Sequence, residues 1–242
     1  MTPILEFHDI VKSYGSGALE VRALTGVSLT IAPGEFVAVR GPSGCGKSTL
    51  LHLAGGLEDP SAGRVVFNGN NLDTLDGAAL AELRRKDVGY VFQRLNLVPA
   101  LTAVENVMLP LELDGVRGRA ARIQAIDALG SVGLDHHLDR YPDDFSGGQQ
   151  QRIAIARAIV GSRRLVLADE PTGSLDTATG DSVIELLASL GAERGTAVVL
   201  VTHEPRFASF ADRVVSMRDG QIVDIAVAPS LDDDHVLSTT RR

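Results

Sequence analysis

Residues 41–49 read GPSGCGKST, a glycine-rich stretch that ends in a lysine and two hydroxyl side chains. The stretch fits the spacing G-x-x-x-x-G-K-[ST] of a phosphate-binding loop. Glycines let successive backbone N–H groups turn toward one anion. Lys47 adds a full charge for the terminal phosphates, and the hydroxyl of Ser48 suits Mg²⁺. The stretch therefore predicts a site for a nucleoside triphosphate.

The elements on either side of this loop are those that the motif needs. The apolar run FVAVR at 36–40 has strand character, and TLLHLAGG from residue 49 is compatible with a helix. A helix that begins at the loop adds the positive end of its dipole to the backbone donors. This context favours a phosphate site over a glycine-rich turn that matches by chance. The predicted site comprises Gly41, Pro42, Ser43, Gly44, Cys45, Gly46, Lys47, Ser48 and Thr49.

Two adjacent carboxylates follow a second apolar run, LVLADE at 165–170. Ligands of open α/β sheets sit at the carboxyl ends of the strands, where these two side chains are expected. Asp169 suits the oxygen shell of Mg²⁺, and Glu170 suits the activation of an attacking water. An acidic turn after a strand is the alternative, and the phosphate loop makes the metal site the better interpretation.

The segment YPDDFSGGQQQRIAIARAIV at 141–160 predicts a second anion site. Ser146, Gly147 and Gly148 precede a helical run, so free backbone N–H groups and a hydroxyl converge on the positive end of a helix dipole. By itself, S-G-G is more often a plain helix cap than a ligand site.

These motifs together resemble the ATP-binding subunit of ABC transporters. The resemblance rests on GPSGCGKST, Gln93, FSGGQ, LADEPTGSLD and His203, which occur in this order, and it covers residues 4–225. The longer blocks FQRLNLVPALTAVENVMLPL and DFSGGQQQRIAIARA resemble the subfamily that serves macrolide exporters, lipoprotein-release complexes and the cell-division pair.

The resemblance implies roles for three side chains around the phosphates. Tyr14 would stack on adenine, Gln93 would reach Mg²⁺ and the attacking water, and His203 would contact the γ-phosphate. From the residues alone, Tyr14 is an aromatic at a strand end and Gln93 is a polar strand terminus. His203 closes the run AVVLVT and would by itself be a satisfied core histidine.

The resemblance also implies that two copies share each nucleotide. Ser146, Gly147, Gly148 and Gln149 would grip the ATP held by the phosphate loop of a second copy, and Asp176 would line the contact between the copies. The alternative for Asp176 is a cap for the helix that follows. The residues alone leave open whether the two anion sites meet within one chain or across two.

Two positions depart from the family pattern. The signature begins with Phe145 where leucine is usual, and a buried apolar side chain is expected there. Cys45 stands where serine is common, beside the expected start of a helix, which activates a thiol. We therefore consider that its alkylation blocks ATP binding; a small residue that packs under the loop is the alternative.

The composition is that of an ordinary globular protein. The 242 residues are 44% hydrophobic and 22% charged, with one cysteine and a net charge of −8. No apolar run reaches 18 residues and the N-terminal region lacks a secretion signal, so neither secretion nor a membrane span is expected. The single cysteine fits the cytosol, and the acidic balance argues against nucleic acid as a partner. The clusters at 84–86 and 163–164 are expected to be solvated basic faces.

The order of the elements indicates how the site is built. Short β-rich segments come first, and a helix begins near Asp73 or Asp76. The run at 88–93 is expected to be a strand that ends in Gln93. The chain is mainly helical from 95 to about 161, and strands then alternate with helices, as in a parallel sheet covered on both faces. One helical face is expected from apolar residues at a spacing of three, namely Ile123, Ile126, Leu129 and Val132.

The element order and the resemblance imply an α/β fold of the P-loop NTPase (RecA-like) type. A mostly parallel sheet core carries an N-terminal antiparallel β layer and an inserted helical subdomain. A single ABC ATP-binding domain is expected at 1–228, with its core at about 1–93 and 165–228 and its helical subdomain at about 94–164. The remaining residues, 229–242, are expected to form a loose tail.

The implied activity is ATP hydrolysis with Mg²⁺, in which head-to-tail closure of a homodimer drives a membrane permease. An FtsX-like or macrolide-exporter-like permease would hold the protein at the inner face of the bacterial cell membrane. A mechanotransmission ATPase that acts on periplasmic or cell-wall machinery without moving cargo is the alternative. A soluble ABC ATPase for DNA or ribosomes fits less well, because no long coiled coil or second ATPase half is present. A P-loop kinase is the other enzyme class considered; it would need a pocket for an acceptor substrate, whereas this sequence has the signature segment instead.

Overall fold

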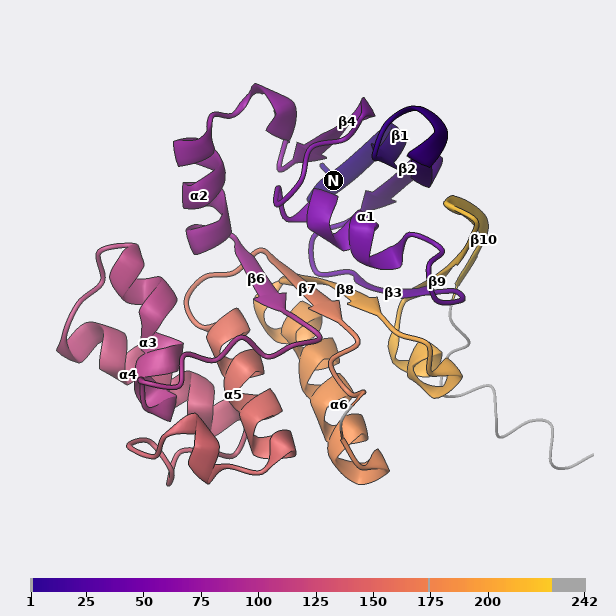
Figure 1. Cartoon of the computed structure of the whole chain (residues 1–242). Helices are drawn as coiled ribbons and strands as arrows, with labels where there is room; N and C mark the ends of the chain where they lie inside the picture. The colour runs from indigo at the N-terminus through magenta and orange to yellow at the C-terminus, as the bar shows by residue number, and fades with distance from the viewer. Residues whose placement is uncertain (1, 174, 228–242) are drawn as a thin grey trace, which may run out of the picture.

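The computed structural model describes residues 2–173 and 175–227, in which the strands form two sheets (Figure 1). The larger sheet has the order β10-β9-β3-β8-β7-β6, and neighbouring strands run parallel except at the β9–β10 edge pair. Its strands are β3 (Phe36–Arg40), β6 (Val88–Val91), β7 (Leu165–Asp169), β8 (Ala197–Val201), β9 (Arg213–Arg218) and β10 (Gln221–Val227). The mostly parallel core predicted from the sequence is confirmed.

The central strands are buried on both faces because helices cover both. In β7, Leu165 and Leu167 belong to the cluster that includes the leucines of α1 (Lys47–Ala54), whereas Val166 and Ala168 pack in the cluster of α5 (Gly147–Ile159) and α6 (Thr177–Arg194). Successive side chains of a strand point to opposite faces, so each needs its own apolar layer. In Figure 1, α1 lies above this sheet and α5 and α6 lie below it.

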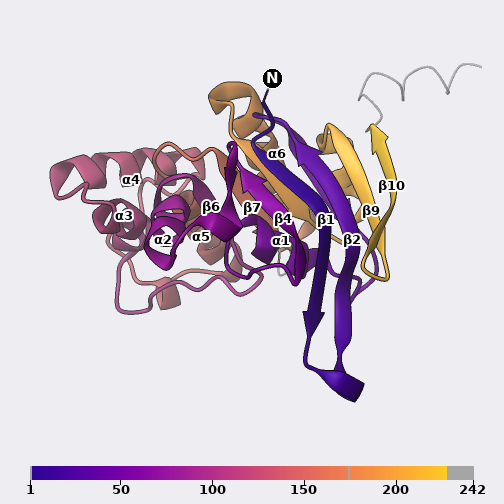
Figure 2. The same cartoon turned by 90° about the horizontal axis from the view of Figure 1, so that it is seen from above.

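The smaller sheet is antiparallel and has the order β2-β1-β4-β5. Its strands are β1 (Leu5–Tyr14), β2 (Val21–Ile31), β4 (Ala62–Phe67) and β5 (Asn70–Asn71). Figure 2 shows its long strands β1 and β2 between the β9–β10 pair and the helices α2 to α5. Its inner face shares one apolar cluster with α1, which encloses that helix between the two sheets. The expected N-terminal antiparallel layer is confirmed.

Capping side chains set where several helices begin. The carboxylate of Asp76, not Asp73, caps α2 (Gly77–Lys86) by accepting from the N–H of Ala79 at 2.8 Å. Thr102 and Glu105 form a reciprocal capping box at the start of α3 (Ala103–Leu113). These hydrogen bonds satisfy N–H groups that have no partner within the helix.

The sequence pattern predicted the buried face of α4 (Arg119–Ser131) only in part. Leu129 and Val132 are buried, but Ile123 is 49% exposed. A step of three residues turns only 300° around a helix of 3.6 residues per turn, so such a row drifts away from one face. The core side of α4 is formed by Ala121, Ala125 and Ala128 together with Leu129.

Other boundaries predicted from the sequence can be compared with the elements of the structure. Strand β6 ends at Val91, two residues before the predicted end at Gln93. The helices α3, α4 and α5 all fall within 94–164, although the division of the chain into core and subdomain stays a prediction. The predicted tail at 229–242 lies outside the described residues. Among residues 2–173 and 175–227, no helix combines the length and apolarity that a bilayer span requires.

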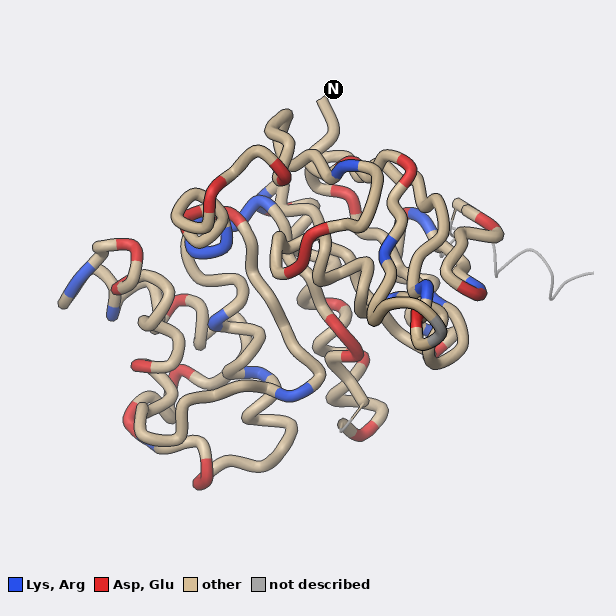
Figure 3. Tube along the Cα trace, turned by 45° about the horizontal axis from the view of Figure 1, so that its top comes forward, with Lys and Arg blue, Asp and Glu red and all other residues tan. Residues whose placement is uncertain are grey.

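Charged residues of both signs are interspersed along the trace (Figure 3). At the end of α2, Arg85 and Lys86 lie 4.0 and 3.8 Å from the carboxylate of Asp114. Lys86 also pairs with Glu82 at 2.7 Å. The basic run at 84–86 is therefore partly neutralised by acidic neighbours.

We predict that Gly89→Ala strongly destabilises the protein. A Cβ at this position in β6 would lie 1.9 Å from the carbonyl oxygen of Ala158 in α5, and neither backbone can move freely. The expected loss of unfolding free energy lies at or above the upper end of the ~1–3 kcal/mol range for overpacked cores. Chemical denaturation measures it.

Gly77→Ala is the matched control, because a Cβ there meets nothing within 4 Å. In the first turn of α2 alanine should be neutral or stabilising by up to about 1 kcal/mol. Equal stability of the two variants would contradict the close approach of α5 to β6.

Candidate functional site

Three loops meet at one edge of the parallel sheet because the strands that lead into them are neighbours. Strands β3, β8 and β7 lie side by side, and the loops that begin at residues 41, 202 and 170 follow their carboxyl ends. A cleft of about 520 Å³ opens there. Its lining residues are Ala23, Gly41, Ser43, Gly44, Gly46, Lys47, Ser48, Thr49, Gln93, Asp169, Glu170 and His203. Apart from Ala23, all of them are predicted site residues.

Glycine is required in the phosphate loop for both conformation and space. Gly46 has φ +102° and forms the N-cap of α1, and a Cβ there would lie 2.5 Å from the carbonyl oxygen of Ala23. The ammonium of Lys47 donates to the carbonyls of Gly41 at 2.9 Å and Pro42 at 3.0 Å. Lys47 is only 7% exposed, so a nearly buried charge sits in the loop beside the start of a helix.

Burial governs the chemistry of Asp169, the last residue of β7. Removal from water raises the pKa of this carboxyl above its ordinary value of 3.8, and a hydrogen bond from Ser48 opposes the shift. Removal from water disfavours the charged form, whereas hydrogen bonds and cations favour it. Asp169 and Ser48, which the sequence places 121 positions apart, therefore lie in contact.

The side chain of Glu170 contacts residues that follow two other strands, β6 and β8. Its backbone has φ +46°, a left-handed conformation that is unusual for a non-glycine residue, and its N–H donates to the carbonyl of Val201 at 2.9 Å. One carboxylate oxygen accepts from Gln93 at 3.2 Å, and the other lies 3.3 Å from Nδ1 of His203. The structure thus brings Glu170, predicted from the run at 165–170, together with Gln93 and His203, two of the side chains to which the resemblance gives a role around the phosphates.

Tyr14 lies at the end of β1, beside the first turn of α1. Its hydroxyl donates to Glu58 at 2.6 Å and lies 3.5 Å from Oγ1 of Thr49, which lines the cleft. The residue is 40% exposed. Tyr14 therefore lies beside the cleft without lining it, and the ammonium of Lys12 lies 5.1 Å from the centroid of its ring. Glu58 holds its hydroxyl.

The signature segment begins α5 with a reciprocal cap. The hydroxyl of Ser146 accepts from the N–H of Gln149 at 3.4 Å, and the side chain of Gln149 accepts from the N–H of Ser146 at 3.1 Å. Gly147 and Gly148 form the first turn between them. Phe145 is buried, as expected.

A second cleft, of about 420 Å³, contains this segment. Its lining residues are Gly133, Leu134, Ser146, Gly148, Gln149, Arg152, Leu175, Asp176 and Thr179. None of them lines the cleft of the phosphate loop. The two predicted anion sites are therefore separate within one chain.

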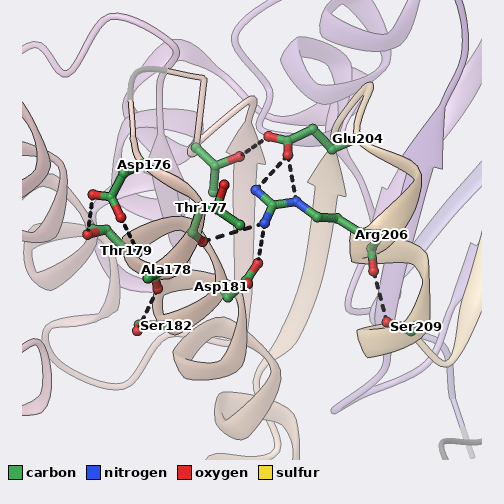
Figure 4. Close-up of polar contacts among 10 residues, drawn as sticks. Asp176, Thr177, Ala178, Thr179, Asp181, Ser182, Glu204, Arg206 and Ser209 are labelled. Atoms are coloured by element: carbon green, nitrogen blue, oxygen red, sulfur yellow. Dashed lines mark hydrogen bonds and ion pairs between the residues drawn. The ribbon is translucent and has the colours of Figure 1, made fainter.

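Asp176 lies in the second cleft and caps α6 (Figure 4). Its carboxylate accepts from the N–H of Thr179 at 3.0 Å and from the hydroxyl of Thr179 at 2.7 Å. The helix-cap interpretation is confirmed by these bonds. The cap leaves Asp176 at the surface of the second cleft.

Cys45 is 3% exposed and packs beneath the phosphate loop, where a Cβ on Gly41 would lie 2.7 Å from its sulfur. This placement favours the interpretation of Cys45 as a small residue that packs under the loop. Two other residues at the site were missed by sequence reasoning, namely Ala23, which lines the cleft, and Glu58, which holds the hydroxyl of Tyr14. Only their tertiary contacts single them out.

Comparison with known proteins decides the family. The family model for ABC transporters matches residues 24–173. The chain belongs to the ABC transporter family. It is accordingly an ABC-type ATPase that binds ATP.

ABC transporter relatives of two kinds are similar to this chain. The lipoprotein-releasing system ATP-binding protein LolD of Geobacter metallireducens is 48% identical over 92% of this chain and 99% of that protein. The macrolide export ATP-binding/permease protein MacB of Hyphomonas neptunium is 46% identical over 91% of this chain but only 34% of MacB. The chain is therefore an ATP-binding subunit of the LolD/MacB type.

Solved ABC cassettes share the fold. The dimeric structure of a post-hydrolysis state of the ATP-binding cassette MJ0796, bound to ADP and Pi, superposes with a TM-score of 0.88 at 38% identity, over 94% of this chain and 100% of that one. A second dimeric MJ0796 structure has the same TM-score at 39% identity, with the same shares of the two chains.

We predict that Asp169→Asn raises the melting temperature of the nucleotide-free protein at pH 7. Burial raises the pKa of this carboxyl, so its ionised form destabilises the folded state. The penalty is fully present above the folded-state pKa and disappears as pH falls through that pKa toward the unfolded-state value. The difference between variant and wild type should therefore shrink in acid.

Thermal unfolding at a series of pH values from about 7 down toward the ordinary carboxyl pKa of 3.8 measures this difference. Asp127→Asn, at an exposed position of α4, is the control and should match the wild type. A lower melting temperature for Asp169→Asn at pH 7 would contradict the role assigned to burial.

Proposed function

We propose that this chain is the ATP-hydrolysing subunit of a membrane transporter, and that two copies close head to tail around ATP. One observation carries the proposal: the phosphate loop and the signature segment line separate clefts. A site that needs both must therefore take one from each copy. We treat residues 1–228 as one ABC domain, with the helical subdomain at about 94–164 as its inserted part.

Binding of the phosphates is the first task of the loop residues. The N–H groups at the start of α1 and the ammonium of Lys47 provide donors and positive charge for the β- and γ-phosphates. Lys47 is held at this position by carbonyls of the loop. A single charge-assisted bond supplies ~1.5–3 kcal/mol, so several must act together to bind a nucleotide.

The residues around Asp169 fit Mg²⁺. The donor set of carboxylate, hydroxyl and amide oxygens from Asp169, Ser48 and Gln93 is what this hard cation takes, together with phosphate oxygens. When bound, Mg²⁺ neutralises charge on the β- and γ-phosphates. The hydrogen bond between Ser48 and Asp169 supports the assignment of both groups to one ion.

Glu170 orients the attacking water. Its carboxylate lies between Gln93 and His203, both within 3.3 Å, so its direction toward the γ-phosphate is set from two sides. His203 and the second copy's signature segment, through Ser146, Gly148 and Gln149, stabilise the charge that develops. In the second copy, Asp176 lines the contact.

The relatives support both the dimer and the transporter. MJ0796 was solved as a dimer bound to ADP and Pi, and LolD and MacB are named for lipoprotein release and macrolide export. In MacB, the region similar to this chain makes up 34% of a combined ATP-binding/permease protein. We therefore assign to this chain an FtsX-like or macrolide-exporter-like permease as its partner and a position at the inner face of the bacterial cell membrane.

An apolar groove next to Gln93 is suited to a cytoplasmic helix of the permease. The groove, of about 290 Å³, includes Leu57 and Leu113, which are 43% and 64% exposed. Its lining also contains the stacked rings of Tyr90 and Phe92, whose centroids lie 4.0 Å apart. Large exposed apolar side chains around a groove are typical of a binding surface. A helix seated there would contact the chain directly beside Gln93.

Glu170→Gln tests the catalytic assignment. The variant should bind ATP normally, lose hydrolysis by about 10²-fold or more, and accumulate as a nucleotide-locked dimer. Size-exclusion chromatography with ATP and a phosphate-release assay measure these properties. A monomeric variant with normal turnover would contradict the assignment.

Lys47→Ala serves as the matched comparison. It should lose nucleotide affinity itself, by roughly 10–100-fold, because a charge-assisted contact of ~1.5–3 kcal/mol is removed.

Leu113→Asp tests the groove. Because the side chain is exposed, the fold and the basal ATPase activity should be unchanged, whereas co-purification with the membrane partner should be lost. Ile123→Asp, at an exposed apolar position of α4 outside the groove, should leave co-purification intact. Equal behaviour of the two variants would contradict the docking assignment.

Mechanotransmission without cargo movement remains the alternative to transport. The co-purified complex separates the two, through ATPase assays with and without candidate substrates in membrane vesicles. Substrate-stimulated hydrolysis together with vesicle transport supports a transporter, whereas hydrolysis that responds only to periplasmic partners supports mechanotransmission.

A further inference from the structure

Arg206 binds two carboxylates on different elements just beyond His203. It lies in the short helix η4 (Pro205–Phe210). Its guanidinium contacts Glu204 at 2.7 and 2.8 Å and Asp181 at 2.7 Å, as Figure 4 shows. Glu204 precedes the helix, and Asp181 belongs to α6. One side chain therefore joins the loop after β8 to the beginning of α6.

The first branch of this network leads to the two catalytic loops. Glu204 directly follows His203, and its carboxylate accepts from the hydroxyl of Thr172 at 3.1 Å. Thr172 is buried, at 4% exposure, and follows Glu170 by two residues. Glu204 thereby ties the loop that carries His203 to the loop that carries Glu170.

The second branch leads to the segment that would face a second copy. Arg206 also donates to the carbonyl of Thr177 at 3.5 Å, in the first turn of α6. Asp176 caps this turn and lines the second cleft. The contacts to Thr177 and Asp181 therefore hold the end of α6 that carries Asp176.

We propose that Arg206 is a positioning residue that keeps His203 and Asp176 in one rigid arrangement. When a second copy contacts Asp176, this arrangement shifts as a unit and places His203 against the γ-phosphate. This inference rests on the proposed function, because it requires two copies around ATP.

The energetics point to a role in geometry rather than in stability. The side chains of Arg206 and Asp181 are 36% and 40% exposed, and exposed ion pairs contribute little to folding stability. Small misplacements of reacting groups, by contrast, lower rates by large factors. Loss of Arg206 should therefore affect turnover more than melting temperature or ATP affinity.

Arg206→Ala in the full chain tests the proposal. We expect kcat for ATP hydrolysis to fall about tenfold, while KM, the Kd for ATP and the melting temperature stay close to wild type. Arg206→Lys, which keeps the charge but not the fork that reaches both carboxylates, should be intermediate. Asp181→Asn should also lower kcat, and the double variant should be no slower than Arg206→Ala alone. Arg194→Ala, at an exposed position in the last turn of α6, is the control.

The outcomes separate this inference from the proposed function. A wild-type kcat for Arg206→Ala would overturn the inference, and so would losses of stability or ATP affinity that account for the fall in kcat. ATP-dependent dimerisation of Glu170→Gln is measured in parallel. If that variant dimerises while Arg206→Ala is fully active, the proposed function stands and the inference fails. If that variant stays monomeric with ATP, the proposed function fails by itself.

Discussion

The parallel register of three neighbouring strands is the constraint on which the site depends. Val201 of β8 is paired with Val39 of β3 on one side and with Asp169 of β7 on the other. All three strands therefore end at the same level, and the loops that follow them emerge together. The phosphate loop, His203 and Glu170 meet for this reason. The apolar character of these strands, which is required for burial on both faces, is thus also what aligns the catalytic groups.

Within this arrangement, several groups adopt states that lower the stability of the folded protein. Asp169 carries its carboxylate away from water, Lys47 is nearly buried, and Glu170 has a left-handed backbone. Buried charge and unusual backbone conformations both reduce stability. The sheet and the helices on its two faces provide the stability that allows these groups to persist. The cleft combines donors and acceptors that a triphosphate and Mg²⁺ would satisfy together.

The chain contains two clefts with complementary parts of one predicted site. The phosphate loop cleft holds the ammonium, the carboxylates and His203, whereas the second cleft holds Ser146, Gly148 and Asp176. Both clefts include the start of a helix, and each start is built by local hydrogen bonds or glycine geometry. Because the two sets of groups lie in separate clefts, hydrolysis in our proposal requires the assembly of two copies. The network of Arg206 connects the two clefts within one chain, so that assembly and catalysis can be linked.

The sequence alone determined the features that depend on a few consecutive residues. The phosphate loop, the cap at Ser146 and the buried strands depend on local backbone geometry and on alternation, which neighbouring residue types reveal. The spacing of three residues did not predict the buried face of α4 correctly at Ile123, because a helix has 3.6 residues per turn and such a row drifts away from one face. The tertiary structure alone decided which distant residues meet: Gln93 with Glu170, Tyr14 with Glu58, and Arg206 with Asp181. These contacts follow from the order of strands in the sheet and from helix packing, which chain order does not specify.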